Sequence, residues 1–61
     1  MAYIEYYRRG RLIWTANYGS MTAAKPSLRP SFEHHQRVDG IDRAVLRDGE
    51  GNVRRVLPAR P

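Results

Sequence analysis

The chain is short and contains no cysteine, and this combination limits what it can fold into. A chain of 61 residues buries only about 60% of the surface that its unfolded form exposes. Ordering it costs on the order of 90 kcal/mol, at about 1.5 kcal/mol per residue. Folds of this size are usually stabilised further by disulfides, a metal, unusually good packing or a partner subunit. Without thiols, neither a disulfide framework nor a thiolate zinc site is available.

We therefore expect a single small domain, residues 1–61, that docks on copies of itself or on a larger assembly. The alternative is a tightly packed minibarrel that folds alone. No apolar run approaches the roughly 18 residues of a membrane span, so no membrane partner is expected. The protein is expected to be soluble, either in the cytoplasm or as part of a virion.

The positive charge is carried almost entirely by arginine. The net charge is +5, and ten of the eleven cationic residues are arginines, with Lys25 as the only lysine. The planar guanidinium suits phosphates, carboxylates and protein interfaces. Codon bias in a GC-rich genome is the alternative explanation, and a single sequence does not separate the two.

Composition along the chain predicts a mainly β fold with four segments. Residues 2–18 form an N-terminal hairpin, 19–40 an extended arm or linker, 41–57 a C-terminal hairpin and 58–61 a tail. The predicted architecture is a small antiparallel sheet or minibarrel built from two β-hairpins. A proline-containing extended segment joins them, and the fold has room for one short helix.

The register of the first hairpin follows from the distribution of apolar residues. A two-residue loop at Arg9-Gly10 would place Glu5 opposite Trp14 and bring a carboxylate against the indole. A three-residue loop ending in a left-handed Gly10 pairs Tyr6 with Leu12 and Ile4 with Trp14. One face then holds Ala2, Ile4, Tyr6, Leu12, Trp14 and Ala16, and the other Tyr3, Glu5, Tyr7, Arg11, Ile13 and Thr15. Since a slip by one residue exchanges the faces, the three-residue loop is preferred.

The second hairpin turns at residues 48–52, where two glycines, an aspartate and an asparagine occur in five positions. If Leu46 and Val53 share a face, that face carries Ala44, Leu46, Val53 and Leu57. The opposite face carries Arg43, Arg47 and Arg54 beside Val45 and Val56. A short helix over residues 41–47, capped by Asp42, is the alternative.

The middle of the chain is predicted to be extended because Pro26 and Pro30 are unfavourable in a helix interior and in a central strand. Residues 20–30 are expected to form an arm that orders on docking. For residues 31–38 two alternatives remain, a helical turn or two capped by Ser31, or a further strand.

No constellation of residues predicts catalysis, a cofactor or a metal site. His34 and His35, beside Glu33, are adjacent, so their side chains diverge on a strand or a helix. Two-histidine metal sites on regular elements usually use wider spacing, which favours solvated or interface histidines. No nucleophile, base and orienting group occur at a linking spacing, and no phosphate-binding glycine loop is present. We therefore expect no enzyme activity, no metal and no cofactor.

The predicted function is a non-catalytic interaction or structural protein, an accessory subunit of an assembly such as a viral particle. Tyrosine, tryptophan and arginine dominate binding hot spots. The candidate partner-binding residues are Tyr3, Tyr7, Trp14, Arg8, Arg9 and Arg11. In an alternative, Tyr6 and Trp14 are core, Tyr3 and Tyr7 are interface residues, and the arginines solvate a strand edge.

The second hypothesis is a small basic nucleic-acid-binding module. Single-strand binders combine a positive groove with aromatic stacking platforms, and small barrels present strands and loops in this way. The candidate nucleic-acid-binding residues are Arg8, Arg9, Arg11, Arg43, Arg47 and Arg54. No sequence motif of a known nucleic-acid-binding class accompanies them.

Overall fold

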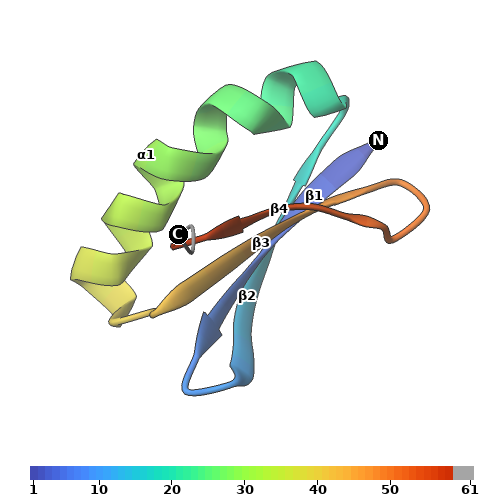
Figure 1. Cartoon of the computed structure of the whole chain (residues 1–61). Coiled ribbons are helices and arrows are strands. Elements are labelled where there is room, and N and C mark those ends of the chain that lie inside the picture. The colour runs from blue at the N-terminus through green and yellow to red at the C-terminus, as the bar shows by residue number, and fades with distance from the viewer. Residues whose placement is uncertain (59–61) are drawn as a thin grey trace.

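A computed structural model describes residues 1–58 and shows a four-stranded antiparallel sheet with one helix on one face (Figure 1). The predicted mainly β architecture of two hairpins is confirmed. The elements, in chain order, are β1 (Ala2–Arg8), β2 (Arg11–Tyr18), α1 (Met21–Asp39), β3 (Arg43–Asp48) and β4 (Val53–Leu57). The strand order is β2-β1-β3-β4, so each hairpin contributes one inner strand and one edge strand.

The segment predicted as an extended arm is a helix, and that prediction is wrong. Ser20 caps the N-terminus, where its hydroxyl accepts a hydrogen bond from the Ala23 amide at 3.2 Å. Gly40 ends the helix in the left-handed conformation, with φ at 69°. Between the caps, buried residues recur every four positions, at Ala24, Leu28 and Phe32. This spacing gives the helix one apolar face.

Pro26 and Pro30 lie inside α1, although proline removes a helical hydrogen bond and disturbs the preceding turn. The two residues are four positions apart, so they share one side of the helix, and both are exposed. Figure 1 shows that α1 follows an arc over the sheet. Burial of the opposite helix face therefore outweighs the local cost of the prolines.

The register of the first hairpin differs from the predicted one because of a β-bulge. Tyr7 pairs with Leu12 across a two-residue loop, whereas Tyr6 pairs with Trp14. The loop residues Arg9 and Gly10 have φ values of 52° and 79°, as in the type I′ turns that suit hairpins. The bulge absorbs Ile13, so Glu5 meets Thr15 rather than Trp14. Because of the bulge, a two-residue loop at Arg9-Gly10 does not bring Glu5 against Trp14, so the predicted three-residue loop is not needed.

The second hairpin also contains a bulge. Leu46 pairs with Arg55 and Arg47 pairs with Val53, which leaves Arg54 as the extra residue. Val53 therefore shares a face with Arg47, not with Leu46 as predicted, and it is 52% exposed. Residues 43–48 are strand, so the alternative helix over 41–47 is wrong.

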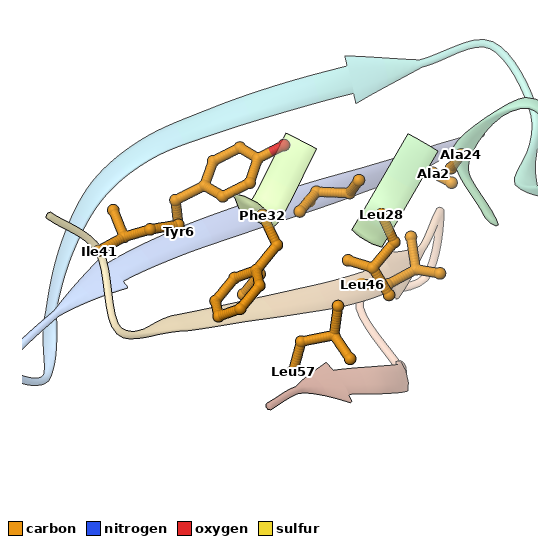
Figure 2. Packing of buried hydrophobic residues seen from close by; sticks show 10 residues of the cluster. Ala2, Tyr6, Ala24, Leu28, Phe32, Ile41, Leu46 and Leu57 are labelled. Carbon is orange, nitrogen blue, oxygen red and sulfur yellow. The ribbon is translucent and has the colours of Figure 1, made fainter. Parts of the chain in front are cut away.

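The core lies between α1 and one face of the sheet, where side chains of both layers meet (Figure 2). Tyr6 crosses this layer, and its hydroxyl donates a hydrogen bond to Ser31 Oγ at 2.8 Å. Burial raises the pKa of the Tyr6 hydroxyl, so the hydroxyl stays protonated and can donate this hydrogen bond. The buried cluster contains Ala2, Ile4, Tyr6, Ala24, Leu28, Phe32, Ile41, Ala44, Leu46 and Leu57.

Candidate interaction surface

Strand β2 forms one edge of the sheet and is poorly protected against pairing with another strand. Its outer side has no neighbouring strand among residues 1–58. Natural edge strands are usually guarded by charges, prolines or short length. Strand β2 is eight residues long, has no proline, and carries a single charged residue, Arg11.

Three consecutive large apolar residues are exposed on this edge. Leu12, Ile13 and Trp14 are 49%, 43% and 57% exposed. Trp14 lies opposite Tyr6 and therefore on the helix side of the sheet, but α1 packs mainly over β1 and β3 and leaves the indole uncovered. The alternative that places both Tyr6 and Trp14 in the core is therefore wrong for Trp14, although Tyr6 is buried. Scattered exposed apolar residues are ordinary, whereas a contiguous run on an open edge is not.

The arginines of the first hairpin gather at its tip. Arg8 and Arg11 face each other next to the loop, and the backbone amide of Arg9 donates to Asp42 Oδ2 at 2.9 Å. This bond holds the tip beside the segment that leads into β3. The side chains of Arg8, Arg9 and Arg11 are exposed, and they form no ion pair within residues 1–58.

Arg43 joins this group because β3 starts beside the end of β1. It lies opposite Tyr7, and its guanidinium carbon is 5.7 Å from the centre of the Tyr7 ring, within the range of a cation–π contact. The structure thus brings four of the six candidate nucleic-acid-binding arginines to one end of the sheet.

The other two arginines lie toward the opposite end of the second hairpin and are engaged by acidic residues. Arg47 Nε donates to Glu5 Oε1 at 2.6 Å, and its Nη1 donates to the Gly51 carbonyl at 2.8 Å. The bond to Glu5 raises the pKa of Arg47. Arg54 Nη1 lies 3.9 Å from Asp48 Oδ2. The six residues therefore do not form one continuous stripe.

The predicted anchors Tyr3 and Tyr7 are half-buried on the open face, by which we mean the side of the sheet away from α1. The Tyr7 hydroxyl donates to Glu5 Oε1 at 3.1 Å, so it shares that carboxylate with Arg47. Val45 of β3 lies opposite Glu5 and is only 1% exposed, although it is outside the main core cluster. The open face is thus ordered by its own polar network.

A groove between α1 and β4 was not foreseen from the sequence. It is lined by Lys25, Pro26, Leu28, Arg29, Arg55 and Leu57. We call it the α1–β4 groove. Its three cations are exposed and form no ion pair within residues 1–58. Lys25 and Arg29 stand four residues apart, a spacing that indicates a shared helix face, but Pro26 and Pro30 predict an extended arm for this segment.

The histidines are accounted for by contacts within α1 and the sheet. His35 Nδ1 lies 2.7 Å from Asp39 Oδ2, and its ring centre is 4.4 Å from that of Tyr6. The described part of the chain holds no group of three histidine, aspartate or glutamate residues placed to bind a metal. Within residues 1–58, no helix is both long and apolar enough to cross a membrane.

Comparisons with protein-family models, with curated proteins and with solved structures found no match to this chain.

Proposed function

We propose that the chain is a non-catalytic docking module, and that β2 pairs with the β2 strand of a second copy. The observation that supports this proposal is the exposed run Leu12–Trp14 on an edge strand whose single charged residue is Arg11. Strand pairing would satisfy the outer backbone groups of β2. It would also shield apolar side chains on both faces of the strand, because Leu12 lies opposite Tyr7 and Trp14 lies opposite Tyr6.

The charge distribution supports a second copy at β2 rather than at β4. Each copy carries a net charge of +5, so association must avoid bringing cations together. In an antiparallel pair related by a two-fold axis, the Arg11 residues lie at opposite ends of the joint. On β4, Arg54 and Arg55 lie on the edge strand itself, where like charges would oppose self-pairing.

Such a contact suits an accessory subunit of a larger symmetric assembly, for example a viral particle. The same edge would serve there for repeated or partner contacts, and the arginines of the hairpin tip would engage acidic groups beside it.

The experiment is sedimentation velocity over a range of protein concentrations, with Ile13→Lys as the test variant. The wild-type chain is expected to approach twice the monomer mass as concentration rises, and Ile13→Lys is expected to stay monomeric. Val38→Lys is the matched control, because Val38 is also exposed, at 65%, but lies on α1. A monomeric wild type, or equal effects of the two variants, contradicts the proposal.

A second candidate function is single-stranded nucleic-acid binding at the hairpin tip. It is favoured by the position of Arg43 over Tyr7, which adds a fourth arginine and an aromatic ring to the tip. Glu5 opposes it, because this carboxylate stands next to Tyr7 on the open face.

Salt separates the two functions. Screening by salt weakens the repulsion between two positively charged copies, so dimerisation should strengthen as salt is added. Nucleic-acid binding weakens with salt through counterion release. Fluorescence anisotropy with a labelled oligonucleotide, on wild type and on a variant with Arg8, Arg9 and Arg11 replaced by glutamine, measures the second effect. An unchanged salt slope in the variant would exclude the tip as the nucleic-acid contact.

A further inference from the structure

We propose that the α1–β4 groove binds an extended acidic peptide segment, which adds to β4 as a fifth strand. This site lies on the opposite edge of the sheet from β2, and neither surface depends on the other. The ligand is identified by two requirements of the groove, a backbone partner for the strand edge and negative charge for the rim.

The first requirement comes from the position of β4. It is an edge strand, so one side of its backbone has no strand neighbour within residues 1–58. An extended peptide supplies amide and carbonyl groups along its whole length and satisfies such an edge by strand addition. A nucleic acid has no such backbone ladder, so the strand edge favours a peptide.

The second requirement comes from the cations around the groove. Lys25 and Arg29 contribute from one face of α1, and Arg55 contributes from β4. Arg55 pairs with core residue Leu46 and therefore lies on the helix side of the sheet. The three positive groups thus converge from two elements on the same groove, and none of the residues among 1–58 that line it is acidic.

The floor of the groove determines which part of the ligand enters. Leu28 and Leu57 are only 3% and 2% exposed, so the floor is closed and offers little apolar surface. Side chains of a strand alternate between its two faces, so every second residue of an added strand would point toward α1. Acidic residues at these alternate positions would reach the cations, and charge-assisted hydrogen bonds to arginine would hold them.

The arginines also explain why another copy of this chain is a poor occupant. A second β4 would bring its own Arg54 and Arg55 to the same edge, where like charges repel. The same charges attract an acidic strand, so the groove discriminates by charge.

The experiment uses the full chain and a fluorescein-labelled peptide that alternates glutamate and valine. Binding is followed by fluorescence anisotropy at low salt. In one variant, Lys25, Arg29 and Arg55 are replaced by glutamine. In the matched control, Arg8, Arg9 and Arg11 are replaced by glutamine, which removes the same number of charges from another exposed site. The groove variant is expected to bind at least about tenfold more weakly because it loses charge-assisted contacts, while the tip variant retains most of the affinity.

Amide hydrogen exchange on the wild-type chain provides a readout that does not rely on any variant. Strand addition is expected to slow exchange in β4, and exchange in β2 is expected to stay unchanged. Ile13→Lys should retain peptide binding, which separates this proposal from the β2 contact.

Several results would overturn the proposal. If the two glutamine variants lost peptide affinity equally, the binding would be explained by non-specific charge attraction. Equal binding of a lysine–valine peptide would remove the charge argument. Protection confined to β2 would place the peptide on the other edge. If a single-stranded oligonucleotide displaced the peptide from the groove at a concentration below that of the peptide, nucleic acid would be the better ligand.

Discussion

The Tyr6 hydroxyl donates a hydrogen bond to Ser31 Oγ at 2.8 Å, and this bond joins the sheet to the helix inside the buried layer. Ser31 Oγ in turn donates to the Leu28 carbonyl at 3.1 Å. The helix is thus fixed to β1 by direction-dependent contacts as well as by apolar packing.

Tyr6→Phe removes the hydroxyl and leaves the ring in place. We expect a loss of about 1 kcal/mol in the free energy of unfolding, as is typical of a neutral hydrogen bond. Urea denaturation of Tyr6→Phe, Ser31→Ala and the double variant measures the coupling between them. Losses that simply add would show that the two side chains do not interact.

Comparing Phe32→Ala with Trp14→Ala tests which of the two aromatic residues belongs to the core. Phe32 is 8% exposed and Trp14 is 57% exposed. We expect Phe32→Ala to cost about 3–5 kcal/mol and Trp14→Ala to cost less than about 1 kcal/mol. The measurement is made at low protein concentration, where self-association does not contribute to stability. A large loss for Trp14→Ala under these conditions would place the indole in the core.

Pro30→Ala is expected to stabilise the protein. Proline in a helix interior is about 3 kcal/mol less favourable than alanine, and the greater freedom of the unfolded variant offsets about 0.4–1 kcal/mol of the gain. Thermal and urea denaturation should show a net increase of about 2–2.6 kcal/mol, with Glu33→Ala as an exposed control on the same helix. A decrease would indicate that the bend at Pro30 is needed for α1 to follow the sheet.

Asp48 makes the second hairpin sensitive to acid. Its carboxylate accepts hydrogen bonds from the backbone amides of Asn52 and Glu50 at 2.9 and 3.0 Å. These bonds lower the pKa of Asp48 below its ordinary value of 3.8, and the bond from Asn52 has the larger effect. The stabilisation is complete above that ordinary value and is lost as the pH falls through the lower pKa of the folded state.

Stability measured against pH therefore should decline below about pH 4, and Asp48→Asn should flatten this part of the decline. Glu33→Gln removes the same charge from an exposed helix position and serves as the charge-matched control. If Asp48→Asn retained the wild-type acid slope, the turn carboxylate would not be responsible.

The two hairpins were predictable because their signals are local. Aromatic and β-branched residues mark the strands, and the turns contain Gly10 and the Asp48–Asn52 run. The faces of β1 were also predicted correctly, with Ile4 and Tyr6 inward and Tyr3 and Tyr7 on the other side. These assignments follow from strand alternation alone.

Helix α1 was missed because Pro26 and Pro30 were given more weight than the spacing of Ala24, Leu28 and Phe32. Each interior proline costs about 3 kcal/mol or more, and tertiary burial of a whole helix face outweighs this local cost. Ser20 and Gly40 cap the helix, but serine and glycine are also common in turns and loops, so they do not by themselves mark a helix.

The bulges and the strand order were beyond reach for a different reason. The position of a bulge depends on how both strands pack, and neither Ile13 nor Arg54 is a residue type that marks a bulge. The pairing of β1 with β3 joins segments that are distant along the chain. The hairpin-tip arginines were therefore locatable from the sequence, whereas the position of Arg43 beside them and the α1–β4 groove required the fold.

The inner position of β1 has a consequence for synthesis on the ribosome. Strand β1 leaves the ribosome before β3, its second neighbour, and all of α1 must be made between them. A nascent chain that ends within α1 would hold Ile4 and Tyr6 on an uncovered hairpin, a state in which transient exposure favours chaperone capture or aggregation. Packing of α1 on the completed sheet, rather than formation of either hairpin, is the step that withdraws these side chains from water.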